Sequence, residues 1–213
     1  MASKQVSGAG EQKNIPSDVL TGYGSNESVQ RRHNEGVALW MLGGLYEIKA
    51  SAKETNGEMS IVEATIPDGA GAPMHVHNCG EAIFVLEGSL RLYRGDNEVF
   101  DAGPGDLVYY PKGTLEGVEN VSGKPARVLL IYSPGGMDDF FAEAGEPAKA
   151  REIPPASSEP FDLDRITEIA ARHGMEVRPK PVDLGASLAS ARHSARPALT
   201  RASEGRAERR AER

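Results

Sequence analysis

Two histidines and a glutamate recur between residues 69 and 88 in the pattern G-x5-H-x-H-x3-E-x6-G. His75 and His77 are separated by one residue, so on a β-strand their side chains point to the same face. Glu81 follows just beyond a short turn and can reach the same point in space. Two imidazoles and one carboxylate that converge in this way form the ligand set typical of non-haem iron and related divalent ions. The pattern therefore predicts a metal site built on strands.

A second run, from residue 105 to residue 120, has the pattern G-x5-P-x-G-x2-E-x3-N. Together the two runs resemble the two motifs of the cupin superfamily. The first run matches the first motif at every fixed position, and the second matches at its Gly, Pro, Gly and Asn positions. Glu116 is the one departure, because the family has a His there as its fourth metal ligand.

Short apolar or alternating segments, separated by Gly, Pro and Asn turns, follow one another from Val37 to Tyr132. Many short strands at regular spacing predict an all-β sandwich or barrel. The cupin resemblance implies a jelly-roll β-barrel, which we place at residues 36–135. Residues 1–35 are predicted to be loosely ordered, and residues 178–213 to form a disordered basic tail.

A short helical extension is predicted to follow the barrel. Apolar residues at helical spacing predict one helix over residues 137–144, with Gly145 as its C′ residue. A second helix is predicted from about residue 163 to residue 173. We assign residues 136–177 to these helices and their linker.

Composition narrows the classes of function. The chain has 213 residues, a formal net charge of -7 and a single cysteine, Cys79. One cysteine allows no disulfide within the chain, which favours a reducing compartment, and the acidic balance argues against general nucleic-acid binding. No apolar run reaches transmembrane length, and residues 1–18 lack the apolar core of a secretory signal. We therefore expect a cytoplasmic protein that contacts neither membrane nor nucleic acid.

Three interpretations of Glu116 stay open. As a fourth ligand, it would complete a set of two His and two Glu that neutralises a divalent ion and suits Mn²⁺ or Fe²⁺. As a residue that does not ligate, it would be a nearby general base whose pKa depends on burial against the charge of the metal. In the third interpretation, the replacement of His by Glu removes both the ligand and catalysis.

Within the cupins, the chain most resembles bacterial single-domain quercetin-dioxygenase-like proteins, through the H-x-H-x3-E motif and the segment from Ser133 to Phe141. The resemblance implies a divalent transition metal, either Fe, Mn, Ni or Co, with Zn as the non-oxidative alternative. His75, His77, Glu81 and Glu116 are the implied ligands. The metal-bound Glu of the family can also take a proton from a substrate hydroxyl, so Glu81 and Glu116 are the candidate catalytic residues.

The resemblance implies a dioxygenase that acts on a small aromatic, enolic or polyketide-type molecule, as in secondary metabolism. Two alternatives stay open. One is a non-oxidative lyase, isomerase or cyclase in which the metal polarises a carbonyl, and the other is a non-catalytic cupin that binds a small ligand. The family resemblance further implies a homodimer that exchanges N-terminal segments.

Aromatic residues of the predicted barrel are candidates for the wall of a substrate pocket. They are Trp40, Tyr46, Phe84, Tyr109 and Tyr110. Ordinary core packing is the alternative interpretation for each of them.

Overall fold

The computed structural model describes residues 28–156 and 161–178, which belong to the first of two compact units of the chain, residues 1–180. One group of strands consists of β1 (Val37–Met41), β2 (Gly44–Ala50), β3 (Ser60–Ile66), β5 (Gly80–Glu87), β8 (Leu107–Tyr110), β10 (Ala126–Ser133) and β11 (Glu146–Pro147). The other consists of β4 (Gly71–His77), β6 (Leu90–Arg94), β7 (Glu98–Ala102), β9 (Glu116–Glu119) and β12 (Met175–Val177). The two predicted disordered segments fall largely on residues 1–27 and 179–213, which lie outside the described residues.

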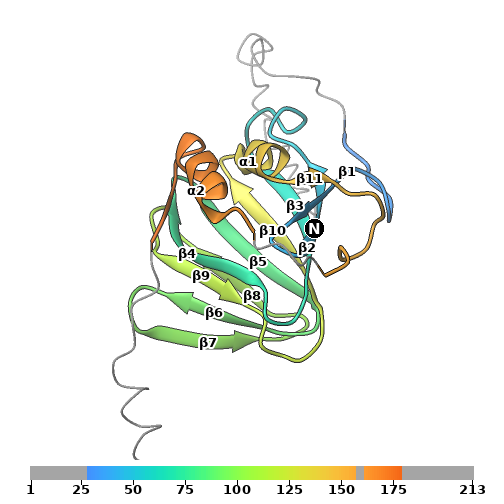
Figure 1. The fold of residues 1–213 in the computed structure, drawn as a ribbon. Helices are drawn as coiled ribbons and strands as arrows, with labels where there is room; N and C mark the ends of the chain where they lie inside the picture. Colours follow the sequence, from blue (N-terminus) through green and yellow to red (C-terminus); the bar gives the residue numbers. More distant parts are fainter. Residues whose placement is uncertain (1–27, 157–160, 179–213) are drawn as a thin grey trace, which may run out of the picture. The chain divides into compact units, whose positions relative to one another are not determined.

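The strands form two antiparallel sheets, as Figure 1 shows. The order is β11-β1-β2-β3-β10-β5-β8 in the seven-stranded sheet and β12-β4-β9-β6-β7 in the five-stranded sheet. Alternate residues of each strand point inward, and the inward set is apolar. Val62, Val85, Leu92 and Val128 are fully buried members of this core. This arrangement confirms the prediction of an all-β jelly-roll barrel.

A two-residue turn, Leu42-Gly43, joins β1 and β2, because Met41 pairs directly with Gly44. Both turn residues have positive φ, 49° at Leu42 and 79° at Gly43. This is the backbone of the tight turns that match the twist of a hairpin, where Asn-Gly is the preferred pair. A leucine in this left-handed region is uncommon and costs free energy.

Two helices follow the barrel, α1 (Met137–Ala144) and α2 (Leu163–Arg172), and they lie against one another over one end of the strands in Figure 1. The α1 helix buries Phe140 and Phe141 in the core, as the helical spacing predicts. The α2 helix begins at Asp162, whose side chain accepts a hydrogen bond from the backbone N–H of Arg165. Neither helix has the length and apolar character needed to cross a membrane, and no other described segment is such a helix.

Gly145 ends α1, but it does not have the left-handed backbone conformation expected of a C′ glycine. Its φ is -81°, which is not the left-handed conformation of the usual C′ glycine. A Cβ atom at this position would lie 2.9 Å from the carbonyl oxygen of Phe141 and 3.0 Å from the Cβ of Leu39. A glycine is therefore needed to let the chain pass close to the helix end and to β1.

The sequence patterns do not predict the strands β11 and β12. After α2 ends, the chain returns as β12 and pairs with β4, so that Met175 lies opposite His77 and Val177 opposite His75. The backbone N–H of Arg178 then donates to the carbonyl oxygen of Met74 at 2.7 Å. The C-terminal extension is thus hydrogen-bonded to the strand that carries both motif histidines.

Candidate metal centre

Three strand ends bring the motif residues together. His75 and His77 lie at the end of β4, Glu81 lies near the start of β5 after a two-residue turn, and Glu116 begins β9. The pairing of β4 with β9 places His75 directly opposite Glu116. One ligand atom from each of the four residues lies within 4.8 Å of the other three, and all four side chains are buried.

His77 lies at the centre of this cluster. Its Nε2 is 3.0 Å from Oε2 of Glu81 and 2.9 Å from Oε1 of Glu116. Neighbouring donors around an ion bound at about 2.1 Å and at right angles to one another lie about 3.0 Å apart. The spacing of these three donor atoms therefore fits a small divalent ion.

The other oxygen of Glu116, Oε2, is buried and has no hydrogen-bond partner among the described residues. A buried carboxylate oxygen without a partner costs free energy, and a bound cation removes that cost. A set of two imidazoles and two carboxylates is also a donor set that divalent transition ions accept. The residues present therefore fit a metal ion.

Backbone carbonyls fix the orientation of both imidazole rings. Nδ1 of His75 donates to the carbonyl oxygen of Pro73 at 2.8 Å, and Nδ1 of His77 donates to that of Cys79 at 3.0 Å. Each Nε2 is thus directed toward the cluster, where it can bind a metal once any proton that it carries has left. The sulfur of Cys79 lies 3.3 Å from Nδ1 of His77, on the side away from the carboxylates.

When no metal is bound, burial and neighbouring groups shift the pKa values of His75, His77 and Glu116. Burial and the nearby charge of Glu81 raise the pKa of Glu116 to about 7, although its hydrogen bond to His77 acts in the opposite direction. Burial lowers the pKa of His77, but its hydrogen bonds with Cys79, Glu116 and Glu81 outweigh burial and raise this pKa to about 12. Burial lowers the pKa of His75. The metal-free cluster thus holds protons that a cation must displace.

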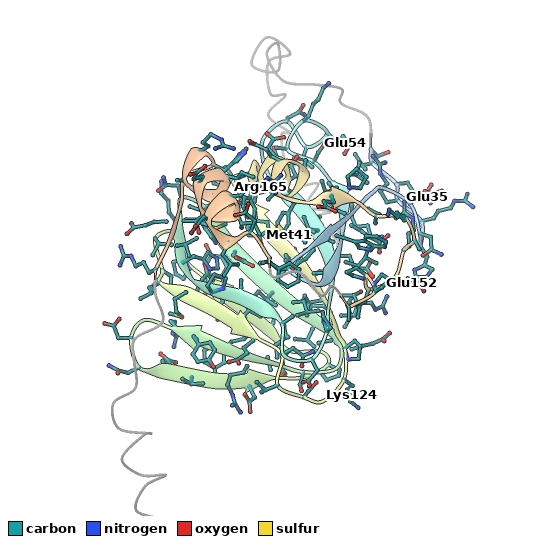
Figure 2. All side chains as sticks on the ribbon, in the orientation of Figure 1. Glu35, Met41, Glu54, Lys124, Glu152 and Arg165 are labelled. Atoms are coloured by element: carbon teal, nitrogen blue, oxygen red, sulfur yellow. The ribbon has the colours of Figure 1, made fainter. Side chains whose placement is uncertain are left out.

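A cavity of about 80 Å³ adjoins the cluster, and His75 and Glu81 form part of its wall. The rest of the wall is almost entirely apolar. It includes Met41, Leu42, Tyr46 and Leu130 from the barrel, Phe140, Phe141, Ile166 and Ala170 from the helices, and Met175 and Val177 from β12. Met41 lies near the centre of Figure 2, beneath the two helices. The helical extension therefore covers the end of the barrel at which the candidate ligands lie.

Tyr132 is a cavity residue that the sequence reasoning missed. It lies on β10 directly opposite Glu81, and its ring meets that of His77 edge-on at 5.8 Å between centroids. Burial, the charges of Glu81 and Glu116, and a hydrogen bond to Glu81 hold its pKa well above the usual value. Alternation along β10 could have found it, since Val128 and Tyr132 fall on the same face.

The predicted pocket residues occupy different places. Tyr46 lines the cavity, where its ring stacks on Phe141. Trp40 lines a second, outer pocket and not this cavity. Phe84 and Tyr109 are absent from both walls: Phe84 alternates with the inward residues of β5, and Tyr109 is 59% exposed.

Tyr110, the neighbour of Tyr109, points inward. Its side chain is fully buried opposite Glu81, and its hydroxyl has no hydrogen-bond partner among the described residues. Burial and the charges of Glu116 and Glu81 raise its pKa. Tyr110 therefore packs beside the cluster without lining the cavity.

The strand order and the buried His and Glu side chains define a jelly-roll barrel with a candidate metal centre at one end. Residues 62–132, which contain both sequence motifs, match the family model of the cupin domain. This part of the chain is therefore a cupin domain.

Each relative matches only part of this chain, and the match can also leave much of the relative uncovered. An uncharacterized protein of Methanocaldococcus jannaschii is 31% identical over 83 residues, which make up 38% of this chain and 66% of that protein. Quercetin 2,3-dioxygenase of Bacillus subtilis is 26% identical over 135 residues, 63% of this chain and 39% of that enzyme. The chain thus spans less than two thirds of the length of either relative. A solved RmlC-like cupin from Shewanella frigidimarina is 18% identical, with a TM-score of 0.46, and the match covers 53% of this chain and 96% of that one.

Proposed function

We propose that the protein is a metal-dependent cupin oxygenase that acts on a small aromatic, enolic or polyketide-type molecule. One observation carries the proposal: the buried cluster of two His and two Glu adjoins an apolar cavity. The match to quercetin 2,3-dioxygenase of Bacillus subtilis supports the reaction class over 63% of the chain. A homodimer and a cytoplasmic location stay predictions.

In this proposal His75, His77, Glu81 and Glu116 hold a divalent Fe, Mn, Co or Ni ion. When bound, such an ion supplies Lewis acidity and access to a second oxidation state. The two carboxylates together neutralise its two positive charges, and the carbonyls that fix the histidine rings keep both Nε2 atoms turned toward it. The chain's own residues thus set the charge and the orientation of the site.

Glu81 is placed to receive a proton from a substrate hydroxyl, because its carboxylate lies both in the cluster and in the cavity wall. The hydroxyl of Tyr132, on the strand directly opposite, is the neighbour that would orient this carboxylate. The apolar wall around them excludes water and so strengthens each electrostatic contact with the substrate. This arrangement suits deprotonation of an enol or phenol whose remaining surface is apolar.

The test combines metal analysis with oxygen uptake. Protein purified without chelator is analysed for metal content, loaded with each candidate ion, and mixed with a panel of flavonols, catechols and β-diketones in an oxygen electrode. Near-stoichiometric Fe, Mn, Co or Ni with substrate-dependent O₂ consumption supports the proposal. Turnover that continues without O₂, in a zinc-containing protein, would instead favour a lyase, isomerase or cyclase. If no ion binds under any condition, the chain is a ligand-binding cupin and the proposal is wrong.

A further inference from the structure

An outer pocket of about 680 Å³ lies next to the metal-site cavity. Its wall comes from the β1–β2 turn, the end of α1, the start of α2 and residues 153–156. Three of its residues, Met41, Leu42 and Ile166, also line the inner cavity. The two spaces are therefore neighbours, separated by these three apolar side chains. The inner cavity holds only a few atoms, whereas the outer volume is typical of a site for a whole small molecule.

Aromatic and aliphatic side chains dominate the wall of the outer pocket. Trp40 forms one side, with its indole N–H donating to the carbonyl oxygen of Glu152 at 2.8 Å (Figure 2 labels Glu152). Phe161 lies over the β1–β2 turn, since a Cβ atom at Gly43 would be 3.4 Å from its ring. Ile153 lies on the same wall. Flat apolar surfaces of this kind favour a ligand that contains a ring.

The charged residues of the pocket do not form a site for an anion. They are Glu146, Asp162 and Arg165. The two terminal nitrogens of Arg165, on α2 in Figure 2, already donate to the carbonyl oxygens of Glu143 and Ala144 at 3.1 Å. The guanidinium therefore completes the end of α1, and the two carboxylates oppose an acidic ligand. The chemistry of the wall selects a neutral molecule.

Leu42 adds an independent observation. It is the turn residue with φ 49°, a conformation that a leucine adopts only at a cost. Asn in its place would suit this turn better. The side chain of Leu42 is part of the wall that the two cavities share. A strained backbone kept at such a point indicates a role for the side chain that the turn itself does not need.

We propose that the outer pocket binds a neutral, ring-bearing substrate. Leu42 is part of the wall between the two cavities, and the reacting end of the substrate passes this residue to enter the inner cavity. For the chemistry at the metal this inference rests on the proposed oxygenase function. Binding in the outer pocket needs no metal and can be measured separately.

The experiment uses the full-length, metal-free protein and N-phenyl-1-naphthylamine, a neutral probe with a naphthyl and a phenyl group that accepts excitation energy from tryptophan. Trp40 is the chain's single tryptophan and lies in the pocket wall, so energy transfer reports binding there. Saturable transfer is expected in the wild-type protein. Ile153→Asp places a charge in the apolar wall and Phe161→Ser removes apolar contact, so each should weaken binding about tenfold. Leu107→Ser alters a side chain that is 62% exposed and lines neither cavity, so it should leave binding unchanged.

Leu42→Asn separates a binding effect from a folding effect. Asn tolerates the left-handed turn, so the thermal midpoint of this variant should be equal to or above that of the wild type, while probe affinity falls severalfold. A variant that folds at least as well and binds less strongly cannot act through misfolding. Unchanged affinity in Leu42→Asn, or a fall in its thermal midpoint, would contradict the role given to Leu42.

The remaining outcomes distinguish this inference from the proposed function. If energy transfer does not saturate, or if wild type, Ile153→Asp and Phe161→Ser bind the probe with equal affinity, the inference about the outer pocket is wrong. This holds even if the enzyme consumes O₂. Pocket binding without O₂ uptake by any metal form overturns the oxygenase proposal and leaves the binding site in place. If turnover is found, Ile153→Asp should raise KM about tenfold with metal content unchanged.

Discussion

Tyr132 on β10 lies directly opposite Glu81 on β5, and interaction with this carboxylate helps to raise the pKa of the tyrosine well above its usual value. Glu81 is thus shared between the candidate metal centre and a phenol that is itself fully enclosed. We therefore expect the tyrosine hydroxyl to help to orient this carboxylate. Tyr132, Glu81 and His75 are among the few polar residues in a wall that is otherwise largely apolar.

Tyr132→Phe should lower turnover about 10- to 100-fold while metal content stays near that of the wild type. The substitution keeps the ring and removes only the hydroxyl that positions Glu81, and the loss of such a partner typically has an effect of this size. Steady-state kinetics combined with elemental analysis of the same sample measures both quantities. Tyr109→Phe, on the outer face of the barrel, is the matched control and should behave as wild type. Equal turnover in the two variants would show that the hydroxyl has no positioning role.

Glu116→Gln distinguishes a ligand from a base. If Glu116 ligates, the loss of its charge should weaken metal binding at least about tenfold. If it acts only as a base, metal affinity should change little and turnover should fall. We expect the first result, because Glu116 lies 2.9 Å from the Nε2 of His77 and has a buried oxygen without a partner among the described residues. Competition with a fluorescent chelator gives the affinities, and Glu119→Gln on the same strand is the control.

Metal binding should release protons, and the number should depend on pH. The pKa of His77 is raised to about 12, so its proton is still present at pH 8 and must leave on binding. The pKa of Glu116 is raised to about 7, so a second proton is present at pH 6 and absent at pH 8. We expect release of about one proton per ion at pH 8 and about two at pH 6, with weaker binding at the lower pH. Calorimetry in buffers of different ionisation enthalpy counts them, and equal counts at both pH values would contradict the assignment.

Through Glu116, the metal-free protein should lose stability as the pH rises from about 4.5 to about 7. Glu116 has a folded pKa above its ordinary value of 4.5, so its protonation stabilises the fold fully below pH 4.5, and this contribution is lost as the pH rises through about 7. A metal ion reverses the trend, because it replaces the displaced protons. At a free concentration of 100 times its Kd, the ion should add about 2.7 kcal/mol to the free energy of unfolding. Thermal denaturation with and without Mn²⁺ measures this gain, which Glu81→Ala should abolish.

The barrel and the cluster could be predicted from sequence because both depend on short-range spacing. The interval between His75 and His77 is a property of one strand, and the glycines of the motifs are local turn signals. The same spacing could have placed Phe84 correctly: once Glu81 points inward, alternation puts Ile83 inward and Phe84 outward. From the sequence alone, Phe84 is instead a candidate for the pocket wall.

The remaining features depend on contacts that no local pattern contains. Met175 and Val177 form a strand only because the edge of β4 is available to them, and three residues are too few to give a periodic signal. The outer pocket joins Trp40 to Phe161, which are far apart in the chain. Alternation along β10 turns Tyr132 inward, but only the pairing of β10 with β5 shows that Glu81 is its neighbour. Tertiary placement therefore supplies what the motifs do not.

The pairing of β12 with β4 also bears on the order of events during protein synthesis. The ribosome releases β4, with both histidines, well before α2 and β12 have been made. Until then the β4 edge has no partner on that side, and the helices that cover the cavity are not yet in place. Because contacts between distant segments form late in folding, the nascent barrel presents an open site, and only the finished chain encloses it. The timing of metal uptake relative to translation therefore decides whether the ion enters an exposed edge or a closed cavity.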